Sequence, residues 1–106
     1  MELNHYQKIA HGTSLHNQPI IYPTLGLTGE SGEVADKVKK VIRDNDGIFS
    51  DEMKRSIALE LGDVLWYAQE LAGDLGYTLE EICQMNIQKI ESRQRRGVIH
   101  GNGDER

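Results

Sequence analysis

The chain has 106 residues, a formal net charge of −5 at pH 7 and a single cysteine. This length suits one domain, and the acidic balance argues against a general nucleic-acid or anionic-membrane surface. No apolar run approaches the roughly 20 residues of a membrane span, the first residues lack the pattern of a signal peptide, and a lone thiol suits a reducing compartment, so we expect a cytoplasmic protein.

The first half of the chain predicts two helices joined by a connector. Apolar positions at helical spacing predict a short helix over residues 3–11 and a longer one over 23–44, opened by a proline that loses no hydrogen bond in the first turn. The polar stretch 13–21 is expected to be irregular. Within it we expect His16 and Asn17 to be surface polar residues, with contact to a ligand as the alternative.

The second predicted helix is weakened by three glycines in its first half. Gly26, Gly29 and Gly32 follow one another at a spacing of three, and each costs roughly 1 kcal/mol of helix propensity relative to alanine. They leave one side of the helix without side chains, so another backbone or a ligand can come close there.

The second half of the chain predicts two further helices with clear end signals. Ser50 or the aspartate after it caps a helix that runs to about Leu75. Thr78 and Glu81 fit a capping box that opens the fourth helix, which ends near Gly97.

Four helices and no strand pattern predict an all-α fold, a four-helix antiparallel bundle-like domain. On the third helix, Leu59 and Trp66 form a second apolar line nearly opposite the main one. A helix that is apolar on two sides is packed on both, within the fold or between subunits. We therefore expect an obligate homo-oligomer.

Two stretches with the shared pattern Glu-x-Gly-acid-Val lie in the second and third helices. Positions i and i+3 share a helix face, so Glu30 and Glu33 point the same way. The same holds for Glu60 and Asp63. Both pairs border apolar stripes, where a carboxylate costs several kcal/mol to desolvate unless positive charge compensates it. Four converging carboxylates suit a divalent cation such as Mg²⁺, and the alternative is four solvated helix acids.

Further polar residues accompany these acids. Lys37 and Tyr67 occupy matching places, one turn after each acid pair. The fourth helix adds Asn86 in the middle of its apolar stripe, with Lys89 and Arg93 on the same side. An acidic cluster faced by cations suits a metal–polyphosphate complex attacked by a positioned water. No GxxxxGK[ST] pattern is present, which excludes a P-loop.

At these residues the chain resembles the all-α nucleoside triphosphate pyrophosphohydrolases of the MazG-like superfamily. The family pattern is Glu-x-x-Glu followed, after a spacer, by Glu-x-x-Asp, and here it falls on residues 30–33 and 60–63. The glycines before the first pair and the Asn-x-x-Lys-x-x-x-Arg of the fourth helix fit as well. The resemblance covers roughly residues 20–97 of a single domain spanning 1–106. Ser31 departs from the pattern, because many members carry a further acid there, which leaves the number of metal ions open.

The resemblance implies hydrolysis of a (deoxy)nucleoside triphosphate to the monophosphate and pyrophosphate, for nucleotide pool cleaning. It also implies dependence on Mg²⁺, with Mn²⁺ as a substitute, and assembly as a homodimer or homotetramer. The implied metal ligands and catalytic residues are Glu30, Glu33, Glu60 and Asp63, with Glu33 also acting on the attacking water. The resemblance implies that Lys89 and Arg93 bind phosphates and that Asn86 binds the sugar or a phosphate. From their positions after the acid pairs, we also expect Lys37 and Tyr67 to bind the substrate.

Three other functions stay open at this point. One is a related pyrophosphohydrolase with another nucleotide-like substrate, such as phosphoribosyl-ATP. The second is a non-catalytic helical protein that binds partners through Leu59 and Trp66, and the third is a metal or nucleotide sensor without turnover.

The tail, residues 98–106, has no apolar periodicity and would be disordered on its own. It follows the cations of the fourth helix directly. The hypothesis is that it folds over a bound nucleotide, with His100 or Arg106 in contact, and the alternative is an ordinary disordered terminus.

Overall fold

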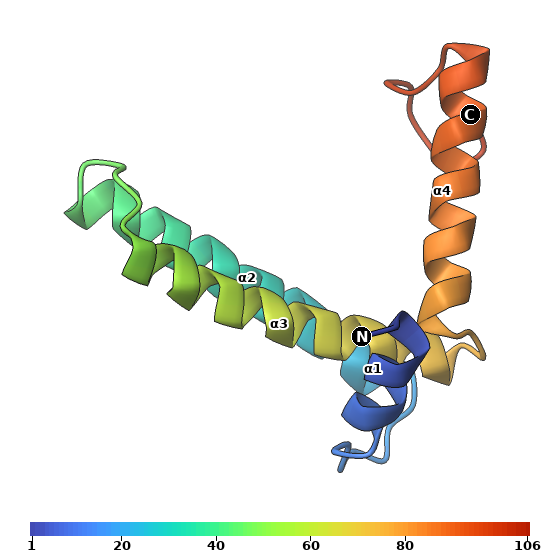
Figure 1. Cartoon of the computed structure of the whole chain (residues 1–106), viewed down its shortest axis with the longest axis horizontal. Helices are drawn as coiled ribbons and strands as arrows, with labels where there is room; N and C mark the ends of the chain where they lie inside the picture. Colours follow the sequence, from blue (N-terminus) through green and yellow to red (C-terminus); the bar gives the residue numbers. More distant parts are fainter.

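A computed structural model describes all residues, 1–106, and contains four helices and no strand (Figure 1). The all-α prediction is confirmed, and the predicted helix boundaries agree with the observed ones within two residues. The helices are α1 (Leu3–His11), α2 (Ile21–Asp44), α3 (Asp51–Asp74) and α4 (Leu79–Arg96).

The predicted capping signals form the hydrogen bonds that explain where α3 and α4 begin and end. The Ser50 hydroxyl accepts from the backbone N–H of Met53 at 3.2 Å. At the start of α4, the Glu81 backbone N–H donates to the Thr78 hydroxyl at 3.1 Å, and the Thr78 N–H donates to the Glu81 carboxylate at 2.9 Å. Gly97 ends α4 with a φ of 72°, a left-handed conformation that glycine adopts without strain.

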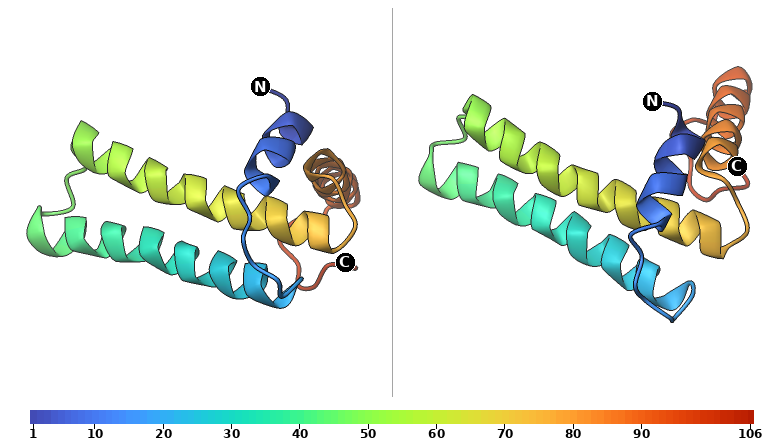
Figure 2. Two further views of the ribbon diagram at one scale, coloured as in Figure 1. Left: turned by 90° about the horizontal axis from the view of Figure 1, so that it is seen from below. Right: turned by 60° about the horizontal axis from the view of Figure 1, so that its bottom comes forward.

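Two long helices, α2 and α3, form an antiparallel hairpin and pack along their length (Figures 1 and 2). The short helix α1 crosses the end of this hairpin where α2 begins and α3 ends. From the same end α4 leads away from the hairpin, which gives the chain an open L shape in Figure 1. α4 contacts α1 and α3 but makes no contact with α2.

This open arrangement leaves much of the apolar surface uncovered. The accessible surface is 7843 Å², against about 6,000 Å² for a folded monomer of this mass. The radius of gyration is 16.6 Å, against about 13 Å for a compact domain of this length. Only eight residues are buried, and Leu59 on the second apolar line of α3 is 61% exposed. None of the four helices is long and apolar enough to cross a bilayer.

In the C-terminal part, the structure corrects the expectation for Asn86 and places the tail beside α4, while contact of the tail with a nucleotide stays a prediction. Asn86 was expected in the middle of a buried stripe, but it is exposed, because nothing packs over the middle of α4. The tail 98–106 turns back along the end of α4 (Figure 1). Lys89 and Arg93 of α4 hold it there through Gly103 and Asp104. The Arg106 guanidinium closes the tail on itself by donating to the carbonyl oxygens of Val98 at 3.0 Å and Ile99 at 2.8 Å.

Candidate functional site

Three of the four predicted acids meet on the α2–α3 hairpin. One carboxylate oxygen from each of Glu30, Glu60 and Asp63 lies within 4.8 Å of the other two. Glu33 lies one helical turn after Glu30, is exposed, and is not part of this group. The equal spacing within the two acid pairs therefore predicted the cluster, while the packing of α2 on α3 decides which three carboxylates are close.

The electrostatics of this cluster favour a bound cation. Burial raises the pKa of the Glu30 carboxyl, and the negative charges of Asp63 and Glu60 raise it further. The donor set consists of carboxylate oxygens alone, which are the ligands that hard cations such as Mg²⁺ prefer, and which Mn²⁺ also accepts. A divalent ion would relieve the repulsion that now disfavours the charged form of Glu30.

Lys37 is positioned at the edge of the acid cluster. Its ammonium lies 3.1 Å from the Glu60 carboxylate and donates to the Ser56 hydroxyl at 2.6 Å. Lys37 therefore offsets part of the negative charge of the cluster in the absence of a ligand.

Tyr67 lies between the acid cluster and the start of α2, and Gly26 makes room for it. A Cβ atom at position 26 would lie no more than 2.5 Å from three ring atoms of Tyr67, whereas one at Gly29 or Gly32 would meet nothing within 4 Å. The Tyr67 ring also contacts Trp66 edge-on, with centroids 5.0 Å apart. The pKa of the Tyr67 hydroxyl is raised, mainly by a hydrogen bond with Tyr22 and to a smaller extent by burial.

An aromatic pocket opens beside the acids. It has a volume of about 630 Å³, and a smaller hollow of about 320 Å³ next to it contains Glu30 and Asp63. The two hollows share Trp66 and Tyr67. The larger pocket is lined by Thr13, Leu15, His16, Asn17, Gln18, Tyr22, Trp66 and Tyr67.

His16, which was predicted to be a surface residue, lies in the wall of this pocket. Its side chain is only 10% exposed, because the connector between α1 and α2 folds against α3. The imidazole stacks on Tyr22, with ring centroids 5.0 Å apart and an interplanar angle of 12°. The expected surface residue is therefore part of the pocket wall, and the alternative of ligand contact stays a prediction.

The cations of α4 do not reach the acids within one chain. Lys89 lies 3.2 Å from the Asp104 carboxylate of the tail. The Arg93 guanidinium is buried and donates to the backbone oxygens of Asp104 at 2.9 Å and Gly103 at 3.3 Å. In the single chain these two residues hold the tail, on a helix that has no contact with α2.

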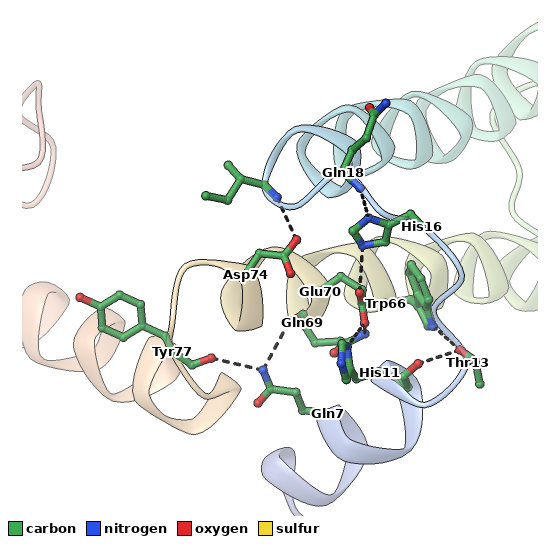
Figure 3. A network of polar contacts seen from close by, with 12 residues as sticks. Gln7, His11, Thr13, His16, Gln18, Trp66, Gln69, Glu70, Asp74 and Tyr77 are labelled. Carbon is green, nitrogen blue, oxygen red and sulfur yellow. Dashed lines mark hydrogen bonds and ion pairs between the residues drawn. The ribbon is translucent and has the colours of Figure 1, made fainter.

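A second polar group, missed at the level of sequence, surrounds Glu70 (Figure 3). This carboxylate is fully buried and accepts hydrogen bonds from His11, His16 and the Gln69 amide. The available signal was the spacing of acidic residues along α3, where Glu70 lies seven residues, or two helical turns, after Asp63, and Asp74 lies four residues after Glu70.

Comparison with known families assigns the chain. Residues 22–98 match the model of the MazG nucleotide pyrophosphohydrolase domain. The chain belongs to the MazG family. It is similar to the Gene 37 protein of Mycobacterium phage L5, with 41% identity over 114 residues and complete coverage of both chains. No solved structure matches the chain.

Membership of the MazG family supports nucleotide pyrophosphohydrolysis as the general class of activity. The matched residues include α3, α4 and all of α2 except its first residue, and so they include the acid cluster. α1 and the connector precede the match. The contacts of Glu70 with His11 and His16 therefore join the family domain to a segment that lies outside it.

Proposed function

We propose that the protein hydrolyses a (deoxy)nucleoside triphosphate to the monophosphate and pyrophosphate with Mg²⁺ as cofactor. The observation that carries this proposal is the acid cluster beside an aromatic pocket, the two sharing Trp66 and Tyr67. A nucleotide needs the same two neighbouring environments, one for a flat base and one for a metal-bound polyphosphate.

The four acids would have two roles at the phosphate end of the site, metal binding and activation of the attacking water. Glu30, Glu60 and Asp63 would hold the ion, and Glu33 lies one turn away. When bound, Mg²⁺ neutralises phosphate oxygens and orients the triphosphate. Glu33 is exposed and can accept a proton from the water whose oxygen attacks the α-phosphorus. The bond from the α-phosphorus to the bridging oxygen then breaks, and pyrophosphate leaves with that oxygen.

The aromatic pocket would bind the base. Tyr22, Trp66 and Tyr67 offer ring faces and edges, and stacking of a base on an aromatic side chain is worth about 1–3 kcal/mol. The amides of Asn17 and Gln18 line the same pocket and can hydrogen-bond to the edge of the base. This composition supports a nucleotide over inorganic polyphosphate as the substrate.

We further propose that a second copy of the chain completes the site. Lys89, Arg93 and Asn86 are the expected phosphate and sugar ligands, yet α4 does not reach α2 in its own chain. The excess accessible surface supports assembly as a homodimer or homotetramer, in which α4 of one protomer can approach the acids of its partner. Light scattering at micromolar concentration should therefore give a mass of at least two chains, and a monomer would contradict this proposal.

A screen of nucleoside triphosphates and phosphoribosyl-ATP with Mg²⁺, scored separately for pyrophosphate and orthophosphate, tests the proposed reaction. Release of pyrophosphate from one or a few nucleoside triphosphates is the expected result. Preference for phosphoribosyl-ATP would favour the related pyrophosphohydrolase, and binding without turnover would favour a sensor. The proposed reaction, on free nucleotides, is consistent with the expected cytoplasmic location.

A further inference from the structure

The buried carboxylate of Glu70 connects two histidines on the connector side of α3 (Figure 3). Its Oε1 accepts from His11 Nδ1 at 2.9 Å, and its Oε2 accepts from His16 Nε2 at 3.2 Å. Burial opposes the charged form of Glu70, but the hydrogen bonds, the first of them from His11, together hold its pKa below the ordinary value. A buried carboxylate of this kind fixes the groups that donate hydrogen bonds to it, because removing one donor leaves part of its hydrogen-bonding capacity unsatisfied.

The two histidines differ in where they lie. The His11 side chain is 71% exposed and does not line the aromatic pocket, whereas the His16 side chain is 10% exposed and forms part of the pocket wall. His16 is therefore the partner through which Glu70 can influence a bound ligand, and His11 is a matched control.

Both ring nitrogens of His16 are already in use. Nδ1 accepts from the Gln18 backbone N–H at 3.3 Å, so the proton of the neutral ring is on Nε2, where it is donated to Glu70. A metal bound among His16, Glu70 and Asp74 would need the Nε2 lone pair, which this tautomer does not offer. One face of the ring is stacked on Tyr22, so a ligand can stack only on the opposite face.

A second contact fixes the far end of the connector. The Asp74 carboxylate, one turn beyond Glu70, accepts from the Ile20 backbone N–H at 2.9 Å. Ile20 has a φ of 68°, an unfavourable value for a β-branched residue. The connector is thus fastened to α3 on both sides of Asn17 and Gln18, the two amide residues of the pocket.

We propose that Glu70 is a positioning residue for base binding, which acts by holding His16 as a stacking wall and setting the place of the adjacent amides. This inference rests on the proposed function. The inference adds that affinity for the base depends on the buried contact between Glu70 and His16, which lies outside the pocket. Glu70 is also separated from the nearest proposed metal ligand on α3, Asp63, by two helical turns.

The test compares Glu70→Leu, His16→Gln and His11→Gln with the wild-type protein on its best nucleotide. Each glutamine still offers the carboxylate an N–H donor, so these two variants remain informative even if Glu70→Leu does not fold. We expect Glu70→Leu and His16→Gln to raise KM about tenfold, with kcat within about twofold, because one stacking face is lost. His11→Gln should change KM less than about twofold.

Two further measurements separate positioning from a general loss of structure. The inhibition constant of inorganic tripolyphosphate, which has no base, should be the same in all three variants and in the wild type. In the double variant with both Glu70→Leu and His16→Gln, KM should rise no further than in either single variant, because both changes remove the same wall. Glu70→Gln retains an acceptor oxygen for His16 and should restore most of the affinity.

Three results would overturn the proposal. The first is an unchanged KM in a folded His16→Gln variant, and the second is an equal rise of KM in His11→Gln. The third is a tripolyphosphate constant that shifts together with KM. Failure of the proposed function is distinguishable, since the wild-type protein would then release no pyrophosphate from any nucleotide.

Discussion

Gly26→Ala is the substitution whose effect the structure specifies most fully. The added Cβ would lie within 2.5 Å of three ring atoms of Tyr67, whereas non-bonded carbon atoms prefer about 3.5–4.0 Å. The ring, which lines both the acid hollow and the aromatic pocket, would therefore have to move away from position 26 by about 1 Å or more.

Two opposing contributions set the expected change in the free energy of unfolding. Alanine in place of glycine in a helix gains about 1 kcal/mol, and overpacking costs about 1–3 kcal/mol. Gly26→Ala should therefore range from neutral to about 2 kcal/mol destabilising. Gly29→Ala and Gly32→Ala meet no atom within 4 Å and should stabilise by up to about 1 kcal/mol.

Urea unfolding at one fixed protein concentration, with KM measured on the same samples, provides the assay. The difference between Gly26→Ala and Gly29→Ala isolates the contact with Tyr67, because both changes carry the same gain in helix propensity. Gly26→Ala should also raise KM for the nucleotide, since Tyr67 lines its pocket. Equal stability and equal KM in the two variants would refute the placement of Tyr67 against Gly26.

Three other changes have defined outcomes. Glu60→Gln should lower kcat by about 100-fold or more. The unfolding free energy of the metal-free protein should change by less than about 1 kcal/mol, because the loss of a partly exposed ion pair with Lys37 is offset by reduced repulsion of Glu30. A large loss of stability with retained turnover would contradict the metal role. Asp104→Asn removes the carboxylate charge beside Lys89 and Arg93 but leaves the backbone contacts of Arg93 in place, and it should lower KM about two- to fivefold. A raised KM, measured in the same assay, would show that the tail assists binding. The pKa of Glu70 is lowered from its ordinary 4.5 in the folded protein, so the stability that this carboxylate contributes is present above pH 4.5 and is lost as the pH falls through the folded pKa. Thermal unfolding should therefore show a steeper fall of Tm with decreasing pH in the wild-type protein than in Glu70→Leu. Equal dependence of Tm on pH in the two proteins would exclude this contribution.

Local signals made the helices and the acid pairs predictable. The capping box of Thr78 and Glu81 acts within four residues, so it needs no knowledge of the rest of the fold. The shared face of Glu60 and Asp63 follows from helix geometry alone, and their meeting with Glu30 requires only that α2 and α3 form the expected hairpin.

Features that depend on how the elements cross were not predictable from the same signals. The burial of Glu70 requires α1 and the connector to fold over the end of α3, and no local pattern encodes that crossing. The exposure of Asn86 has a similar cause, because the apolar spacing on α4 indicates a covered face but does not identify the chain that covers it.

Phosphorus NMR of the reaction products is the most direct test of the central claim, that the acids on α2 and α3 hold a divalent ion for pyrophosphohydrolysis. With Mg²⁺ and the preferred nucleotide, monophosphate and pyrophosphate signals should grow in equal amounts, and both should disappear with EDTA or in Glu60→Gln. Formation of diphosphate and orthophosphate, or turnover that persists without a divalent ion, would contradict the account.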